Sequence, residues 1–220
     1  MQHSNDSLSQ ELVALARNDL SVRGDLVADG SLGLHGYHPR MEAVHKYNAA
    51  RLAAIIEQYG WPGLTLVGED GAWAAWLIVQ HSIGNPTFMR ECLSLLKQAA
   101  SSGEAISWQV AMLEDRILMY EGKPQIYGTQ YKPDKSGQLS PYQIENPESV
   151  NDRRLAVGLN TIEERTAELR SQQTGENIPT SPELEGQYEE WLYSVGWRAK
   201  LEAQQSSAAD RPTATRFDGD

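Results

Sequence analysis

The sequence predicts a mostly α-helical fold: a single domain that carries one β-hairpin. Apolar residues recur at a helical spacing of three to four in successive segments, and the segment 72–79 is apolar on every side. A tyrosine- and glutamine-rich segment at about 124–145 is interrupted by turn residues, which is typical of a hairpin. Because a helix without a polar face is buried all round, we expect about seven helices arranged around the one at 72–79.

The first two helices have clear boundary signals. Ser7 and Gln10 have the spacing of a capping box ahead of a leucine-rich stretch that runs to about Gly24. A proline at the start of residues 39–59 can open the second helix, and Gly60 stops it. Both helices are amphipathic, so each should bury one face against the rest of the domain.

The remaining elements follow in the same way. Acidic residues just before 72–79 favour a helix start there through the helix dipole. Further helices are expected at 86–100, at 104–120, from about 147 to 158, and from a capping box at Thr161 to about 170. In the predicted hairpin, Gln125 and Tyr127 would point to the same face of one strand. Gly128 in mid-strand suggests a bulge or the close approach of another group.

The domain is expected to occupy residues 1–170. A polar linker should follow at 171–183, then an amphipathic C-terminal helix at 184–201 and a disordered tail at 202–220. The stripe of two tryptophans and two tyrosines at 184–197 should not stay in water. It could dock on its own domain, on a second copy of the chain, or on a separate protein partner.

Composition excludes several function classes. The chain has 19 basic and 30 acidic residues, a net charge of −11, so binding to nucleic acid or to an anionic membrane surface is not expected. No apolar run is long enough to span a bilayer, and the N-terminus lacks the features of a signal peptide. Because Cys92 is the one cysteine of the chain, no intrachain disulfide can form. Its surroundings predict that it is a small buried hydrophobic residue. We expect a cytoplasmic protein.

Gln80 and His81 are the most informative polar residues, because they end the apolar helix at the edge of the expected core. His81 could be a general base or a ligand-binding donor, or a buried histidine with a structural hydrogen bond. Asp115 lies on a partly buried helical stripe, so it needs a partner, and Arg116, Arg153 or His81 could supply it. Paired with His81 it would orient a general base; otherwise it would form an ion pair between helix and hairpin.

Asn48 and Arg51 are one turn apart, with His45 one turn before them, on a stripe that faces either water or a pocket. His35 and His38 lack nearby paired carboxylates or cysteines, so no metal site is expected, and no cofactor motif is present. The amides and hydroxyls of the predicted hairpin suit recognition of a polar molecule, or they satisfy a hairpin packed across helix ends.

Six stretches together resemble an uncharacterised, mainly bacterial family of helical proteins that is common in actinobacteria. They are YHPRMEAVHKYNAARL, GWPG, LVGEDGAWAAWLIVQH, LEDR, GKPQIYGTQY and DRRLAVGL. The resemblance runs from about Leu12 to Leu169 and implies one domain, without an activity. The recurrent polar positions of the family pattern are all matched here: Asn48, Arg51, Gln80, His81, Asp115, Arg116, Gln125, Tyr127, Gly128, Thr129, Gln130, Asp152 and Arg153.

The sequence therefore favours a small-molecule-binding protein, and whether it is also an enzyme stays open. As an enzyme it would use His81 as general base and Asp115 to orient it. The residues expected to bind a polar or anionic substrate are Asn48, Arg51, Gln80, Arg116, Gln125, Tyr127, Thr129, Gln130 and Arg153. The alternative is a non-catalytic, acidic interaction or immunity-type protein that uses its charge and the stripe at 184–197.

Overall fold

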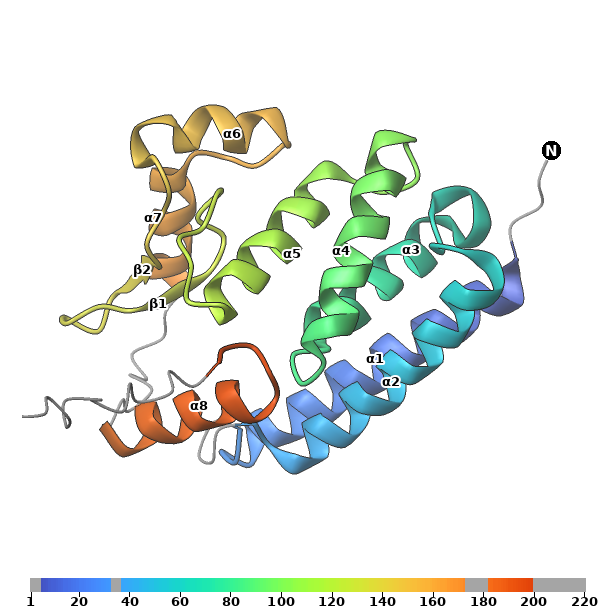
Figure 1. The fold of residues 1–220 in the computed structure, drawn as a ribbon, viewed down its shortest axis with the longest axis horizontal. Helices are drawn as coiled ribbons and strands as arrows, with labels where there is room; N and C mark the ends of the chain where they lie inside the picture. The colour runs from blue at the N-terminus through green and yellow to red at the C-terminus, as the bar shows by residue number, and fades with distance from the viewer. Residues whose placement is uncertain (1–4, 33–36, 173–181, 200–220) are drawn as a thin grey trace, which may run out of the picture.

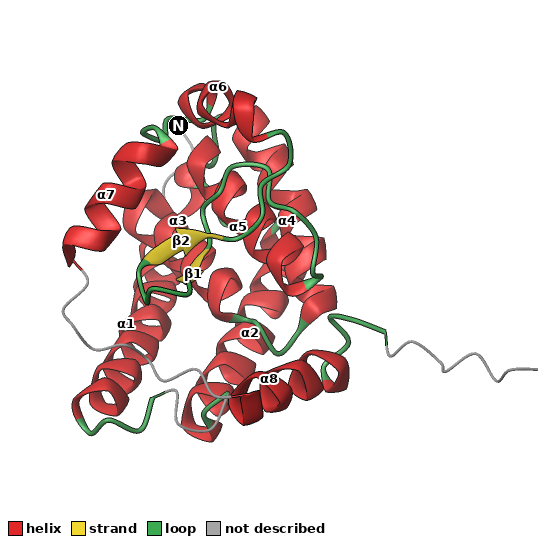
Figure 2. Ribbon diagram, turned by 90° about the vertical axis from the view of Figure 1, so that its left-hand side faces the viewer, coloured by secondary structure: helices red, strands yellow, loops and turns green. Residues whose placement is uncertain are grey.

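The computed structural model describes residues 5–32, 37–172 and 182–199 of the 220-residue chain. Within these ranges the elements follow one another from α1 to α8 (Figures 1 and 2). They are α1 (Asp6–Ala28), α2 (Pro39–Tyr59), α3 (Leu64–His81), α4 (Pro86–Ser101), α5 (Ser107–Tyr120), β1 (Tyr131–Pro133), β2 (Leu139–Pro141), a 3-10 turn (Pro147–Ser149), α6 (Val150–Ala156), α7 (Ile162–Gln172) and α8 (Pro182–Ser194). The predicted mostly α-helical domain with one hairpin is confirmed, with eight α-helices in the described ranges.

The first two helices show how local signals set the boundaries. The start of α1 is capped by Asn5, whose side chain accepts a hydrogen bond from the backbone N–H of Leu8 at 3.1 Å. The expected capping box at Ser7 therefore lies inside the helix, which also continues past Gly24 to Ala28. The bounds of α2 are those predicted from its opening proline and its terminal Gly60, which has φ +76°.

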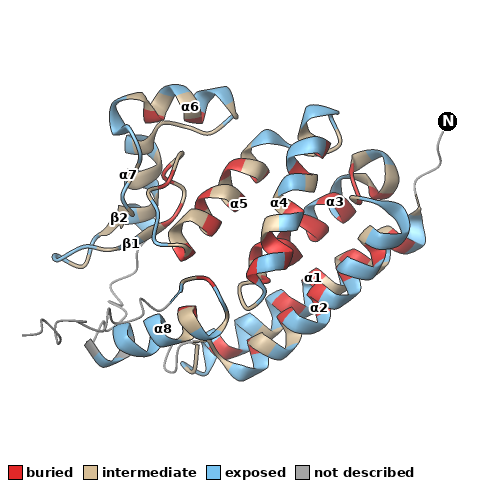
Figure 3. Ribbon diagram, viewed as in Figure 1, coloured by how far each residue is buried: buried red, intermediate tan, exposed pale blue. Residues whose placement is uncertain are grey.

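The core surrounds α3, as the apolar segment 72–79 predicts (Figure 3). The paired helices α1 and α2 pack on one side of α3, and the paired helices α4 and α5 pack on the other. Ala74, Ala75 and Val79 are fully buried, whereas Trp73 is 41 % exposed. A break at Gly68, with φ +69°, separates a first turn from the main body of the helix. The C-terminus of α3 brings His81 to the junction with α1, α2 and α5.

The hairpin is shorter than expected. Only residues 131–133 and 139–141 pair as antiparallel strands, with Lys132 opposite Ser140. The segment 124–130 is a loop with one isolated bridge, from Gln125 to Ile144, so the predicted alternation of its side chains across a strand is wrong. The backbone N–H groups of Ile126, Tyr127 and Thr129 donate to the carboxylate of Asp115 on α5, so a strand partner cannot use them as well.

The C-terminal segment lies against its own chain. Leu192 and Trp197 are buried, and the indole N–H of Trp197 donates to the carbonyl oxygen of Ile83 at 2.7 Å. Arg198 donates to the carbonyl oxygen of Tyr120 at 2.9 Å. Of the three expected alternatives, docking on its own domain is the one that the structure contains. Residues 173–181 of the expected linker and the expected tail at 202–220 lie outside the described ranges.

No helix within the described ranges is long and apolar enough to cross a bilayer.

The capping box predicted at Thr161 is confirmed: its hydroxyl accepts from the N–H of Glu164, and the carboxylate of Glu164 accepts from the N–H of Thr161. This cap starts α7 beside β2 and α6.

Candidate functional site

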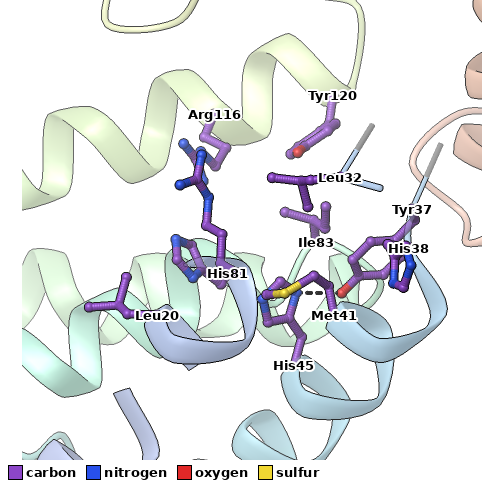
Figure 4. Close-up of a pocket in the computed structure, with 11 residues that line it drawn as sticks. Leu20, Leu32, Tyr37, His38, Met41, His45, His81, Ile83, Arg116 and Tyr120 are labelled. Carbon is purple, nitrogen blue, oxygen red and sulfur yellow. Dashed lines mark hydrogen bonds between the residues drawn. The ribbon is translucent and has the colours of Figure 1, made fainter. Parts of the chain in front are cut away.

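A cavity of about 480 Å³ lies where α1, α2, the end of α3 and α5 meet, and we call it the His81 cavity (Figure 4). In the close-up, α5 carries Arg116 and Tyr120 on one side, and α2 carries Met41 and His45 on the other. Its size is within the range of roughly 300–1,000 Å³ that is usual for small-molecule sites. The lining residues are Leu20, Arg23, Leu32, Tyr37, His38, Met41, His45, His81, Ile83, Arg116 and Tyr120.

Beneath the cavity, two histidines flank one buried carboxylate. Nδ1 of His81 lies 2.9 Å from Oδ1 of Asp19. Nε2 of His45 lies 3.2 Å from Oδ2 of the same carboxylate, without the alignment of a hydrogen bond. The two imidazole rings are tilted against each other with centroids 5.3 Å apart. Asp19 comes from α1, His45 from α2 and His81 from α3, so the packing of three helices assembles the cluster.

Burial controls the ionisation of this cluster. Burial by itself would raise the pKa of Asp19, but the neighbouring imidazoles of His45 and His81 outweigh it and lower that pKa to about 2. Burial lowers the pKa of His81 below its ordinary value, although Asp19 acts in the opposite direction. Near neutral pH the cluster therefore contains an ionised carboxylate next to a neutral His81. A neutral imidazole can accept a proton or bind a metal ion.

Tyr37 fixes the second histidine. Its hydroxyl lies 2.6 Å from Nδ1 of His45, and the two rings stack at a centroid distance of 5.6 Å. Burial raises the pKa of Tyr37, so the phenol stays protonated. On its other side Tyr37 contacts the edge of Trp191 of α8. The C-terminal segment thus supports one wall of the His81 cavity.

The opposite wall is cationic. Nη1 of Arg116 donates to the carbonyl oxygen of Gln80 at 2.9 Å, and its Nε donates to Oε1 of Gln130 at 3.2 Å. Both acceptors are neutral, and among the described residues no carboxylate forms an ion pair with Arg116 or with Arg23. The cavity therefore has two guanidinium groups whose charge is not neutralised by an acidic side chain.

Asp115 does not take part in this cluster, which corrects the expected pairing with His81. Its buried carboxylate accepts hydrogen bonds from the backbone N–H groups of Ile126, Tyr127 and Thr129 at 2.8–3.2 Å. Burial raises the pKa of Asp115, while these three donors lower it. Asp115 is thus the anchor of the loop 124–130, and Asp19 is the carboxylate beside His81.

Most of the other polar residues of this region bind the same loop. The side chain of Gln125 accepts from the N–H of Gln130 at 2.7 Å and donates to its carbonyl oxygen at 3.1 Å. The hydroxyl of Thr129 accepts from the amide of Gln130, and Arg153 donates to the carbonyl oxygen of Ile126 at 2.7 Å. Tyr127 is half-buried and contributes its N–H to Asp115. No residue of the loop 124–130 lines the cavity, and Gln130 contacts the lining residue Arg116.

Three predicted residues lie on α2 and α3, outside the cavity lining. Asn48 is buried and donates to the carbonyl oxygen of Leu15 at 3.3 Å, which ties α2 to α1. Arg51 is exposed and pairs with Glu11. The side chain of Gln80 is buried, and neither of its amide atoms has a hydrogen-bond partner. Of the residues expected to form a pocket, the structure brings together His81 and Arg116, with Gln130 behind Arg116.

Sequence reasoning missed Asp19, and its signal is visible in retrospect. Leu12, Ala16 and Asp19 share one buried stripe of α1 at helical spacing. An acid in such a stripe needs a partner. His45 was expected only to belong to a polar stripe, and it is 8 % exposed. Arg154 was also missed; its buried guanidinium donates to the carbonyl oxygens of Tyr127 and Asn160.

Comparison with known proteins gives a family and no activity. The sequence matches the Family of unknown function (DUF6624) over residues 6–175, which is more than half of the chain. No curated protein matches, and no solved structure matches. The match ends before α8, so the segment that contacts Tyr37 lies outside the region shared with this family.

Proposed function

We propose that this chain, which belongs to the DUF6624 family, binds a small polar or anionic molecule in the His81 cavity. The observation that carries the proposal is the unneutralised guanidinium of Arg116 on the wall of a cavity that also contains His81. Guanidinium groups hold carboxylate and phosphate oxygens with two parallel hydrogen bonds. A ligand of this kind would supply the acidic partner that Arg116 lacks among the described side chains.

The opposite wall supports an acid–base role for the same site. With its Nδ1–H donating to Asp19, His81 would present the lone pair of Nε2 as a proton acceptor. This is the arrangement in which a carboxylate orients a general base. As an enzyme, the protein would hold the anionic part of a substrate with Arg116 and remove a proton from it with His81.

The alternative of a non-catalytic interaction protein has less support. That hypothesis relied on an exposed aromatic stripe at 184–197, and two of its residues, Leu192 and Trp197, are buried against the same chain. Clustered, desolvated polar groups around a cavity are instead typical of a small-molecule site. The negative net charge of the chain remains compatible with either class. Our proposal also retains the expected bacterial origin and cytoplasmic location; a chain whose one cysteine is a free, buried thiol is compatible with a reducing compartment.

A thermal-shift screen tests the proposal, because a specific ligand stabilises only the folded state. The screen would use small mono- and dicarboxylates, amino acids and phosphate monoesters, and a concentration of 100 times the dissociation constant adds about 2.7 kcal/mol. The matched variants are Arg116→Gln, which removes the charge in the cavity, and Arg165→Gln, which removes an exposed charge on α7.

We expect hits that stabilise the wild-type protein and the Arg165→Gln variant and leave Arg116→Gln unaffected. Hits that stabilise all three proteins equally would place the binding site elsewhere. For each hit, the His81→Gln variant then separates binding from catalysis: it keeps a hydrogen-bonding group of similar reach but removes the proton acceptor. Chemical change of a hit by the wild-type protein, lost in His81→Gln, would identify an enzyme.

A further inference from the structure

The buried end of the cluster contains polar atoms that the protein does not satisfy. Asp19 and His45 are 1 % and 8 % exposed, yet Oδ2 of Asp19 and Nε2 of His45 have no hydrogen-bond partner. They lie 3.2 Å apart but are not aligned for a hydrogen bond with each other. A buried polar group without a partner is costly. The two atoms are within ion-pair distance of each other, and a third body that contacts both of them would satisfy both.

The distances suit a metal ion as that body. Two ligand atoms about 2.1 Å from one ion are separated by about 3.0 Å at a right angle and by about 3.4 Å at a tetrahedral angle. The separations here are 2.9 Å from Nδ1 of His81 to Oδ1 of Asp19 and 3.2 Å from Nε2 of His45 to Oδ2, the other oxygen of the same carboxylate. Ligand atoms of all three residues lie within 4.8 Å of one another. The three residues are therefore close enough to contact one ion through one nitrogen of each histidine and the carboxylate.

We infer that Asp19, His45 and His81 bind one divalent transition-metal ion, through the carboxylate of Asp19, Nε2 of His45 and Nδ1 of His81. Two imidazoles and one carboxylate suit Zn²⁺, Co²⁺, Mn²⁺ or Fe²⁺ better than Mg²⁺ or Ca²⁺, which prefer oxygen ligands. Three protein ligands leave at least one coordination position open. The inference goes beyond the proposed function, since it assigns a ligand of its own to the cluster.

A supporting contact is already in place around one ligand. The hydroxyl of Tyr37 lies 2.6 Å from Nδ1 of His45, so that Nδ1–H can donate to Tyr37 and Nε2 presents its lone pair to the ion. Metal-binding histidines almost always have such a partner on the other ring nitrogen, and its loss lowers metal affinity about 10- to 100-fold. Tyr37 is therefore a positioning residue for the ion.

An ion at this place would also compensate the buried negative charge of Asp19. Asp19 brings one negative charge into the protein interior, and a buried charge is retained when it is paired or coordinates a metal. A divalent cation would leave one net positive charge beside the cavity that contains Arg116. The bound ion also makes His81 a ligand, so proton transfer by His81 is confined to the metal-free protein.

Titration of Co²⁺ into the tag-free full chain, previously stripped with EDTA, tests the inference by visible absorption and calorimetry. We expect one Co²⁺ per chain with visible bands typical of nitrogen and oxygen ligands, and competition by Zn²⁺. The His45→Gln and His81→Gln variants should bind at least about 100-fold more weakly, and Tyr37→Phe about 10- to 100-fold more weakly. The control is His38→Asn, which removes a histidine of the same cavity but keeps a residue suited to cap α2.

Equal Co²⁺ binding by the wild type and by a His45→Gln/His81→Gln double variant would overturn the inference, because the ion would then bind elsewhere. Absence of Co²⁺ and Zn²⁺ binding by the wild-type chain at millimolar concentration would overturn it too. If a variant fails to fold, the stoichiometry and absorption bands of the wild type still decide. This titration contains no small-molecule ligand, so its outcome is independent of that of the thermal-shift screen. The screen itself can be run on metal-free and on metal-loaded protein.

Discussion

Nδ1 of His81 lies 2.9 Å from Oδ1 of Asp19, although 62 positions of sequence separate the two residues. The contact exists because α1 packs along α3, which places Asp19, on the buried stripe of α1, beside the C-terminus of the central helix. Asp19 is 1 % exposed, and the low dielectric of a buried environment strengthens the contact. The proposed acid–base role of His81 and the inferred metal site both depend on this relationship.

Asp115→Asn should destabilise the protein by about 2–4 kcal/mol. The carboxylate accepts from three backbone N–H groups of the loop 124–130, and an amide would turn one acceptor into a donor that faces an N–H. Urea denaturation measures the loss. The matched control is Asp152→Asn on the exposed face of α6, which should change stability by less than about 0.5 kcal/mol. Equal effects of the two substitutions would contradict the anchoring role of Asp115.

Gly128→Ala should cost more than Gly103→Ala, although both glycines have positive φ, +67° and +78°. Left-handed backbone costs an alanine about 1–2 kcal/mol at either position. At Gly128 a Cβ would also lie 2.7 Å from Cδ1 of Ile144 and 2.9 Å from Cδ1 of Ile162, whereas at Gly103 it would meet nothing within 4 Å. We expect at least about 1 kcal/mol of additional loss at Gly128. Similar melting temperatures for both variants would show that the loop 124–130 can shift enough to accommodate the added Cβ.

Cys92 should be unreactive in the folded protein. Its side chain is 1 % exposed, and burial, with a smaller contribution from Glu91, raises the pKa of the thiol to about 12. At pH 8 only about one thiol in ten thousand is then ionised. Labelling by iodoacetamide, followed by mass spectrometry, should be at least about 100-fold slower in buffer than in guanidinium chloride. Comparable rates would show that the α4 region opens readily.

Trp197→Ala should destabilise the protein by about 3–5 kcal/mol, which lowers the melting temperature by on the order of 10 °C. The indole is 3 % exposed, stacks on Tyr120 and donates to the carbonyl oxygen of Ile83. The control, Tyr47→Ala, removes an aromatic ring that is 66 % exposed and should have little effect. Scanning calorimetry compares the two variants. An unchanged melting temperature for Trp197→Ala would mean that the C-terminal segment does not stabilise its own domain.

Helices were predictable from the sequence because their signals are local. The bounds of α2 follow from one proline and one glycine, and the burial of α3 follows from its lack of a polar face. The loop 124–130 was misread as a strand, because its conformation is imposed by Asp115, which precedes it on another element. A side chain that binds backbone N–H groups from a distance leaves no periodic pattern.

The site was predictable only in part. His81 was identified from its place at the end of an apolar helix, and Arg116 as a candidate partner of Asp115; both line the cavity. Their partner Asp19 was missed because the pairing depends on how α1 and α3 pack, which helical spacing alone does not give. Asp115 had the same signal as Asp19, an acid on a buried stripe, and only the structure separates their partners.

Locating a bound compound tests the central claim most directly, namely that the His81 cavity is the binding site for a small polar or anionic molecule. The measurement is a crystal structure of the protein with the compound that gives the largest thermal stabilisation in the screen. Our account predicts an anionic group within hydrogen-bonding distance of Arg116 and the body of the molecule beside His81. A compound bound at a different surface, with the His81 cavity unchanged, would contradict it.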